Sequence, residues 1–176
     1  MSTELPRVDE LAPVRPPEPT SWTRPLRWAA AAYLLLCGVV ALATNVLFET
    51  RSAIERSLLA SNPQLGGDQL QASVALGLAF AWVTVAVIVV GAVVLALASY
   101  RGWRWAFWAD LVVLAIGAIQ VVTNALALTS AATQVQPPVA VAADLVLSVV
   151  ALALLVWFVL AVTRYGPWAM RRPGAG

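Results

Sequence analysis

Four long apolar runs dominate the pattern of hydrophobic and polar positions, at residues 28–48, 72–98, 105–129 and 139–163. Each run exceeds the roughly 20 residues that an α-helix needs to cross a hydrocarbon core about 30 Å thick. The runs lack the strict alternation of barrel strands, and in lipid a helix satisfies its own backbone hydrogen bonds. The pattern therefore predicts an all-α, polytopic membrane protein in which residues 26–165 form a four-transmembrane-helix bundle.

Polar segments flank this domain. Residues 1–25 hold six prolines and little apolar surface, which predicts a disordered, Pro-rich tail. The Pro-Pro-Glu-Pro stretch inside it is also typical of a polyproline ligand. Residues 166–176 form a second polar tail.

The segment between the first two runs carries helix signals of its own. Arg51 and Glu55 are spaced for an ion pair on a helix, so the first helix is expected to continue above the membrane until Asn62-Pro63 ends it. Asp68, with Gln71 three residues later, predicts a capping box at the start of the second transmembrane helix.

Composition agrees with the membrane assignment and excludes much chemistry. Hydrophobic residues make up 61% of the chain and charged residues only 11%, against about 25% charged in soluble domains. The chain has no histidine, which excludes His-ligated haem, a Ser–His dyad and most zinc sites. Its one cysteine, Cys37, has no partner for an intramolecular disulfide. We therefore expect no enzyme, no cofactor and no metal site.

The placement of arginine predicts the orientation. The N-terminal tail, the loop between the second and third runs and the C-terminal tail carry nine Arg between them: Arg7, Arg15, Arg24, Arg27, Arg101, Arg104, Arg164, Arg171 and Arg172. The other side carries Arg51 and Arg56 only. The positive-inside rule places the nine, and both termini, in the cytoplasm. The net charge of +2 and the scattered Arg argue against nucleic-acid binding.

Aromatic residues crowd the same side, where interfacial anchors are expected. They are Trp22, Trp28, Trp103, Trp105, Trp108, Trp168, Tyr100 and Tyr165.

The two halves of the chain share a weak internal repeat. Arg27-Trp28-Ala29 opens the first run and Arg104-Trp105-Ala106 opens the third, and a Thr-Asn pair recurs near the far end of both. This predicts two tandem helical hairpins related by an axis along the membrane normal. The alternative is chance similarity between two segments rich in Ala, Val and Leu.

Several polar residues lie within the runs and form the candidate intramembrane polar site: Asn45, Asp110, Gln120, Asn124 and Asp144. With Gly117, the three in the third run fall within about 80° of helical arc, so this stripe should face the bundle interior. Asp110 is expected to pair with Arg27, Arg101 or Arg164, and Asp144 to meet Arg51 or water. A structural role competes here with ion transport, because ionisable residues in a membrane are functional candidates.

Small residues recur at heptad spacing on the second run and form a candidate helix-packing face: Ser73, Gly77, Thr84, Gly91 and Ala98. Small residues let helices approach closely in lipid. The spacing does not decide whether the partner helix belongs to this chain or to another.

The layout resembles uncharacterised four-span integral membrane proteins of GC-rich, actinobacterial-type bacteria. The resemblance covers residues 26 to about 168 and is carried by the Pro-rich tail, the outer Arg/Glu helix before Asp68-Gln69-Leu70, and Arg101-Gly102-Trp103-Arg104-Trp105-Ala106. It implies a multi-pass protein of the cell (plasma) membrane.

Two functions remain. The first is a structural or accessory component that packs with a larger membrane complex or self-associates. Its partners are the lipid bilayer and a membrane protein or a second copy. The alternative is a small oligomeric transporter or channel that uses the intramembrane polar residues.

Overall fold

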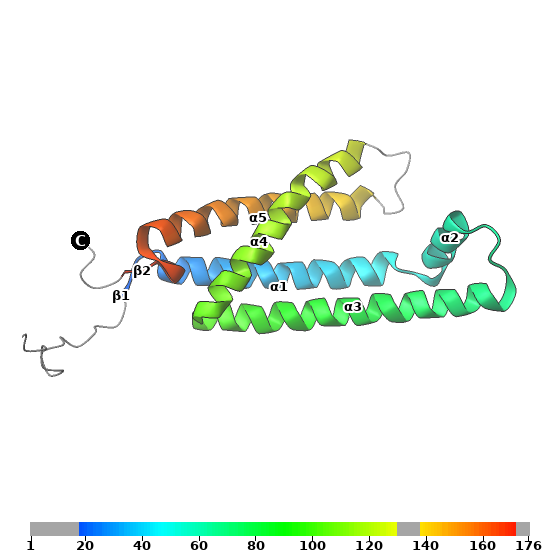
Figure 1. Cartoon of the computed structure of the whole chain (residues 1–176), viewed down its shortest axis with the longest axis horizontal. Coiled ribbons are helices and arrows are strands. Elements are labelled where there is room, and N and C mark those ends of the chain that lie inside the picture. The colour runs from blue at the N-terminus through cyan, green and yellow to red at the C-terminus, as the bar shows by residue number, and fades with distance from the viewer. Residues whose placement is uncertain (1–17, 130–137, 172–176) are drawn as a thin grey trace, which may run out of the picture.

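In the computed structural model of the chain, which describes residues 18–129 and 138–171, four long helices pack as two hairpins (Figure 1). In chain order the elements are β1 (Glu18–Pro19), α1 (Thr23–Phe48), α2 (Arg51–Ser61), α3 (Gly67–Arg101), α4 (Arg104–Thr129), α5 (Pro138–Tyr165), the 3-10 helix η3 (Pro167–Ala169) and β2 (Met170–Arg171).

The four long helices, α1, α3, α4 and α5, coincide with the four apolar runs. Each is long and apolar enough to cross a membrane. The prediction of an all-α bundle of four candidate spans, arranged as two hairpins, is confirmed. At 35 residues, α3 is about 52 Å long by the helical rise per residue, so it extends well beyond a hydrocarbon core of about 30 Å.

Small residues bring the helices of each hairpin together. In the α1–α3 hairpin, Gly38 faces Ala92, and a Cβ atom at Gly38 would lie 3.3 Å from the Ala92 Cβ. In the α4–α5 hairpin, Gly117 faces Ala151, where the corresponding distance is 2.9 Å. Close approach of this kind favours helix association in lipid, where burial of apolar side chains adds little. In Figure 1, α5 lies alongside α1, and α4 crosses obliquely.

At one end of the bundle, the segments before α1 and after α5 are tied together. β1 and β2 pair as antiparallel strands, with Glu18 opposite Arg171 and Pro19 opposite Met170. The expected tail of residues 1–25 is therefore corrected: Glu18 to Pro25 belong to β1, its connection and the start of α1, and residues 1–17 lie outside the described part. The expected tail of residues 166–176 is corrected likewise, because η3 and β2 occupy Pro167 to Arg171. We call β1, η3 and β2 the clasp, and this end of the bundle the clasp end.

Trp168 in η3 packs into the core at the clasp end. The side chain is fully buried and packs against Phe107 and Phe158, at ring-centroid distances of 5.4 and 5.9 Å. Its Nε1 donates a hydrogen bond to the Trp103 carbonyl at 2.8 Å. The prediction that Trp168 is an interfacial anchor is wrong, because this residue is part of the core.

The opposite end of the bundle, the α2 end, departs from the sequence prediction in two places. The helix does not continue from α1. It breaks at Glu49, and α2 starts anew with Thr50 as its N-cap, whose hydroxyl accepts from the Ala53 amide at 3.4 Å. The capping box at Asp68 is also wrong, since α3 begins at Gly67 after Gly66 and has no side-chain cap.

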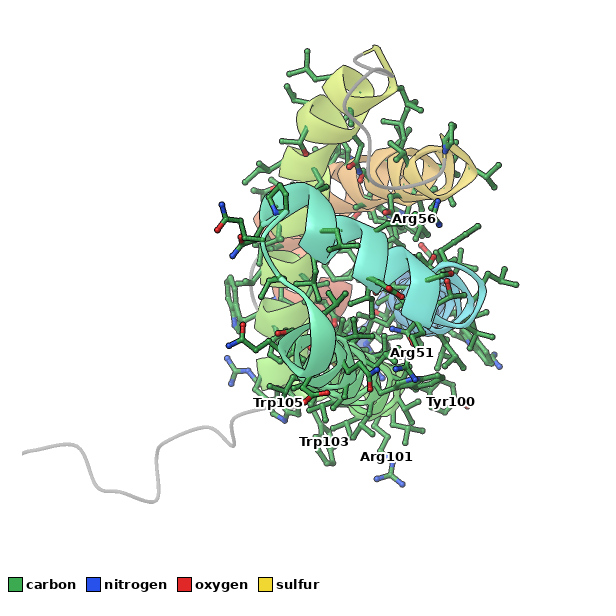
Figure 2. All side chains as sticks on the ribbon, turned by 90° about the vertical axis from the view of Figure 1, so that its right-hand side faces the viewer. Arg51, Arg56, Tyr100, Arg101, Trp103 and Trp105 are labelled. Carbon is green, nitrogen blue, oxygen red and sulfur yellow. The ribbon has the colours of Figure 1, made fainter. Side chains whose placement is uncertain are left out.

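Figure 2, seen from the α2 end, shows Arg51 and Arg56 on α2 and, at the periphery of the bundle, Tyr100, Arg101, Trp103 and Trp105. These last four residues belong to the clasp end, and Arg101 is exposed. About half of the surface of each aromatic residue among them is exposed, and the same holds for Trp28 and Trp108. That exposure is what an interfacial aromatic belt requires.

Candidate functional site

Asp110 is the most deeply buried of the polar residues predicted from sequence. Only 2% of its surface is exposed, and Ser99 Oγ donates to its Oδ2 at 2.6 Å. This bond joins the end of α3 to the start of α4. The second oxygen, Oδ1, has no hydrogen-bond partner within the described residues.

The expected ion pair of Asp110 with an arginine is not the arrangement seen. Arg101 and Arg164 have exposed side chains. The Arg27 guanidinium lies over the Trp168 ring, with Cζ 5.9 Å from its centroid, and Nη2 lies 3.6 Å from Met170 Sδ. The hydrogen-bond partner of the Asp110 carboxyl group is therefore the Ser99 hydroxyl and not an arginine.

A second polar contact links α4 and α5 nearer the α2 end. Asn124 Nδ2 donates to Ser148 Oγ at 3.0 Å, and Ser148 Oγ donates to the Asp144 carbonyl at 2.7 Å. Asn124 and the Asp144 backbone are thus brought together through Ser148. The Asp144 side chain is half-buried.

Asn45 and Gln120, the other two residues of the candidate polar site, differ in burial. Asn45 on α1 is 5% exposed, and its Oδ1 has no hydrogen-bond partner in the described ranges. Gln120 is exposed, so the prediction that the whole polar stripe of α4 faces inward is wrong at this residue. Gln120 lies at the edge of the stripe, about 80° around the helix from Asp110, outside the inward-facing arc that Asp110 and Asn124 occupy.

The small-residue face of α3, which consists of Ser73, Gly77, Thr84, Gly91 and Ala98, is covered only at its ends. Gly77 packs against Ile54 of α2, with 3.0 Å between Ile54 Cγ2 and an added Cβ, and Ala98 is buried in the core at the clasp end. Between them, Thr84 and Gly91 are exposed, and among the described residues a Cβ at Gly91 would meet no atom within 4 Å beyond the local backbone of α3. The small residues at heptad spacing are therefore packed at Gly77 and Ala98 and exposed at Thr84 and Gly91.

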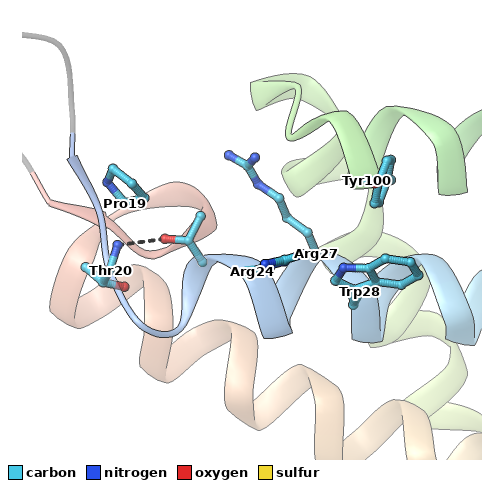
Figure 3. A pocket seen from close by; sticks show the side chains of 7 residues that line it. Pro19, Thr20, Arg24, Arg27, Trp28 and Tyr100 are labelled. Atoms are coloured by element: carbon cyan, nitrogen blue, oxygen red, sulfur yellow. Dashed lines mark hydrogen bonds between the residues drawn. The ribbon is translucent and has the colours of Figure 1, made fainter.

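Sequence reasoning missed a pocket at the clasp end, between the start of α1 and the end of α3. Its volume is about 310 Å³. Figure 3 shows Pro19 and Thr20 at one side, Trp28 and Tyr100 at the other, and Arg24 and Arg27 between them. The sequence feature that could have indicated this pocket is the cluster of basic and aromatic residues from Arg24 to Trp28. The pairing of β1 with β2, which builds one wall, has no local sequence pattern.

Gly102 fixes the position of Arg27 in this region. It ends α3 in the left-handed conformation, at φ 73°, and the Trp103 amide donates to the Ala98 carbonyl at 3.0 Å. The Arg27 guanidinium occupies the space where a Cβ at residue 102 would lie. Glycine is therefore required here both by the backbone conformation and by the packing of Arg27.

Within the described residues, no three His, Cys, Asp or Glu side chains are grouped so that they could hold a metal ion. Comparison with protein-family models, with curated proteins and with solved structures finds no match to the chain. The fold and its buried interhelical contacts define the class: this is a multi-pass integral membrane protein, an all-α bundle with four candidate spans.

Proposed function

We propose that the chain is a non-enzymatic accessory protein of the plasma membrane that acts by packing laterally with another transmembrane helix. The proposal includes a cytoplasmic location for both termini and fits the bacterial four-span proteins that residues 26–168 resemble. The observation that carries it is the open middle of the small-residue face of α3, at Thr84 and Gly91. The same face already holds Ile54 at Gly77, so its geometry accepts a helix.

The intramembrane polar residues support an accessory role as well. Asp110 and Asn124 use their hydrogen bonds to join α3 to α4 and α4 to α5. Asn and other polar residues in membrane helices commonly hold helices together in this way.

The test is purification of the tagged full-length protein from its native membrane in mild detergent, followed by mass spectrometry. We expect a stoichiometric partner or a second copy, which Gly91→Leu removes because the added side chain fills the open position. Ala86→Leu is the matched control, since Ala86 is also exposed on α3 but lies about 140° around the helix. Equal association of wild type and Gly91→Leu would contradict this use of α3.

Transport by a small oligomer is the second candidate. It is favoured by Asn45 Oδ1 and Asp110 Oδ1, buried oxygens that have no hydrogen-bond partner in the part of the chain that the structure describes. It is tested by ion flux into vesicles that contain the purified protein. Flux that Asp110→Asn or Asn45→Ala abolishes, at unchanged folded yield, would favour transport over the accessory role.

A further inference from the structure

The pocket at the clasp end has the composition of an anion site. Arg24 and Arg27 place two guanidinium groups along it, and none of its lining residues is acidic. We propose that it binds the phosphate group of an anionic phospholipid from the surrounding bilayer. The proposal goes beyond the accessory role and does not depend on it.

Arg27 lacks an anionic partner in the described part of the chain. Its Nε is buried and has no hydrogen-bond acceptor among the described residues, and Nη2 donates to the weakly accepting Met170 Sδ at 3.6 Å. A guanidinium has five N–H donors in a planar fork that matches the oxygens of a phosphate. Arg27 therefore has unused donors on a side chain that Gly102 and Trp168 already hold in place.

The two threonine hydroxyls of the pocket already donate to a backbone carbonyl. Thr20 Oγ1 and Thr23 Oγ1 both donate to the Ala169 carbonyl, at 2.7 and 2.9 Å. Each hydroxyl has a single proton, so neither has one left for a ligand. Trp28 Nε1–H and the Tyr100 hydroxyl can also donate, but the two guanidinium groups are the charged donors of the lining, and the site therefore favours an anion over a neutral headgroup.

The surroundings of the pocket identify the phosphate as that of a lipid. Trp28 and Tyr100 form an edge-to-face pair beside it, with ring centroids 5.1 Å apart, and both are about half exposed. Aromatic residues of this kind lie at the headgroup level of a bilayer. Leu35, Val39 and Val46 are exposed on α1 within about 20° of Trp28, so they offer an acyl chain a continuous apolar path away from the pocket.

The experiment is native mass spectrometry of the full-length protein in mild detergent with added phosphatidylglycerol, and with phosphatidylcholine for comparison. We expect retention of phosphatidylglycerol, with the apparent affinity reduced about tenfold or more in the double variant Arg24→Gln/Arg27→Gln, since each charged hydrogen bond contributes to binding. The matched control is Arg101→Gln, which removes an exposed guanidinium next to Tyr100 but outside the lining.

Three results would overturn the proposal: unchanged affinity in the double variant, an equal loss in Arg101→Gln, or equal retention of the two lipids. Displacement of the lipid by millimolar inorganic phosphate would assign the site to free phosphate instead. Arg27 also packs in the clasp, so Arg24→Gln, at an exposed side chain, decides the matter if the double variant does not fold. Arg27→Lys, which keeps the charge but loses the planar fork, should bind with intermediate affinity.

Discussion

Ser99 and Asp110 show how a single buried polar pair stabilises this bundle. Ser99 Oγ lies within hydrogen-bond distance of both Asp110 Oδ2, at 2.6 Å, and the Leu95 carbonyl, at 2.7 Å. The hydroxyl has one proton, so it donates to only one of these two acceptors at a time. An amide at residue 110 would resolve this competition, since its NH₂ group can donate to Ser99 while Ser99 donates to Leu95.

We therefore expect Asp110→Asn to keep the stability of the wild type, and Asp110→Ala to lower the free energy of unfolding by about 0.5–2 kcal/mol, the range of interhelical hydrogen bonds in membranes. Titration with SDS in mixed micelles measures both. Ser99→Ala, alone and combined with Asp110→Ala, completes a double-mutant cycle. A loss in Asp110→Asn as large as that in Asp110→Ala would mean that the charge of Asp110, rather than its hydrogen bond, stabilises the protein.

Individual residues were predictable as far as a helical wheel could place them. The wheel put Asp110 and Gly117 on the inner arc of α4, which is where they lie, but it could not show how wide that arc is, and Gln120 at its edge is exposed. Trp168 was missed for another reason. Its burial depends on a positive φ of 58° and on distant contacts with Phe107 and Phe158, none of which a local pattern encodes.

At the scale of elements, the contact between α4 and α5 depends on Gly117. An added Cβ would lie 2.9 Å from Ala151 Cβ and 3.1 Å from Tyr33 Oη, so this one position touches two other helices. The 2.9 Å approach is closer than carbon atoms tolerate, and one of the helices must move to relieve it.

Gly117→Ala is therefore expected to destabilise the protein by about 1–3 kcal/mol, as overpacking does in well-packed interiors. Ala151→Gly in the same chain should restore much of the loss, because it removes the atom that clashes. The denaturation midpoint in detergent is the measurement. Gly91→Ala is the control, since an added Cβ there would meet no other described atom within 4 Å beyond the local backbone of α3, and it should be neutral or slightly stabilising. An equal effect at both glycines would show that helix propensity, not packing, sets the result.

The long helices were predictable as elements because lipid imposes their length and hydrophobicity together. Their ends were less so. Thr50 restarts a helix that the charge spacing of Arg51 and Glu55 had predicted to be continuous with α1, and Gly66-Gly67 replaces the expected cap at Asp68. The end of a helix depends on the backbone conformation of a few residues, which several sequences can adopt. A transmembrane span depends instead on hydrophobicity, which about twenty consecutive residues share.

At the scale of the whole molecule, charge divides the two ends of the bundle. Among the described residues, the clasp end carries five Arg from the ends of the long helices and one from β2: Arg24, Arg27, Arg101, Arg104, Arg164 and Arg171. The α2 end mixes Arg51 and Arg56 with Glu49, Glu55 and Asp68. Because Glu18 pairs with Arg171 in the two strands, the first and last described residues lie at the same end of the bundle.

This arrangement leads to a topology prediction. The Arg-rich clasp end should remain in the cytoplasm, since short loops with excess arginine resist translocation. A fluorescent protein that folds only in the cytoplasm should therefore be bright when it is fused at either terminus. Alkaline phosphatase, which is active only outside the cytoplasm, should be active when inserted after Asn62 in the α2–α3 connection. Opposite readings at the two termini would mean an odd number of spans. Reversed readings at all three sites would place the Arg-rich end outside, and the positive-inside rule would then fail for this chain.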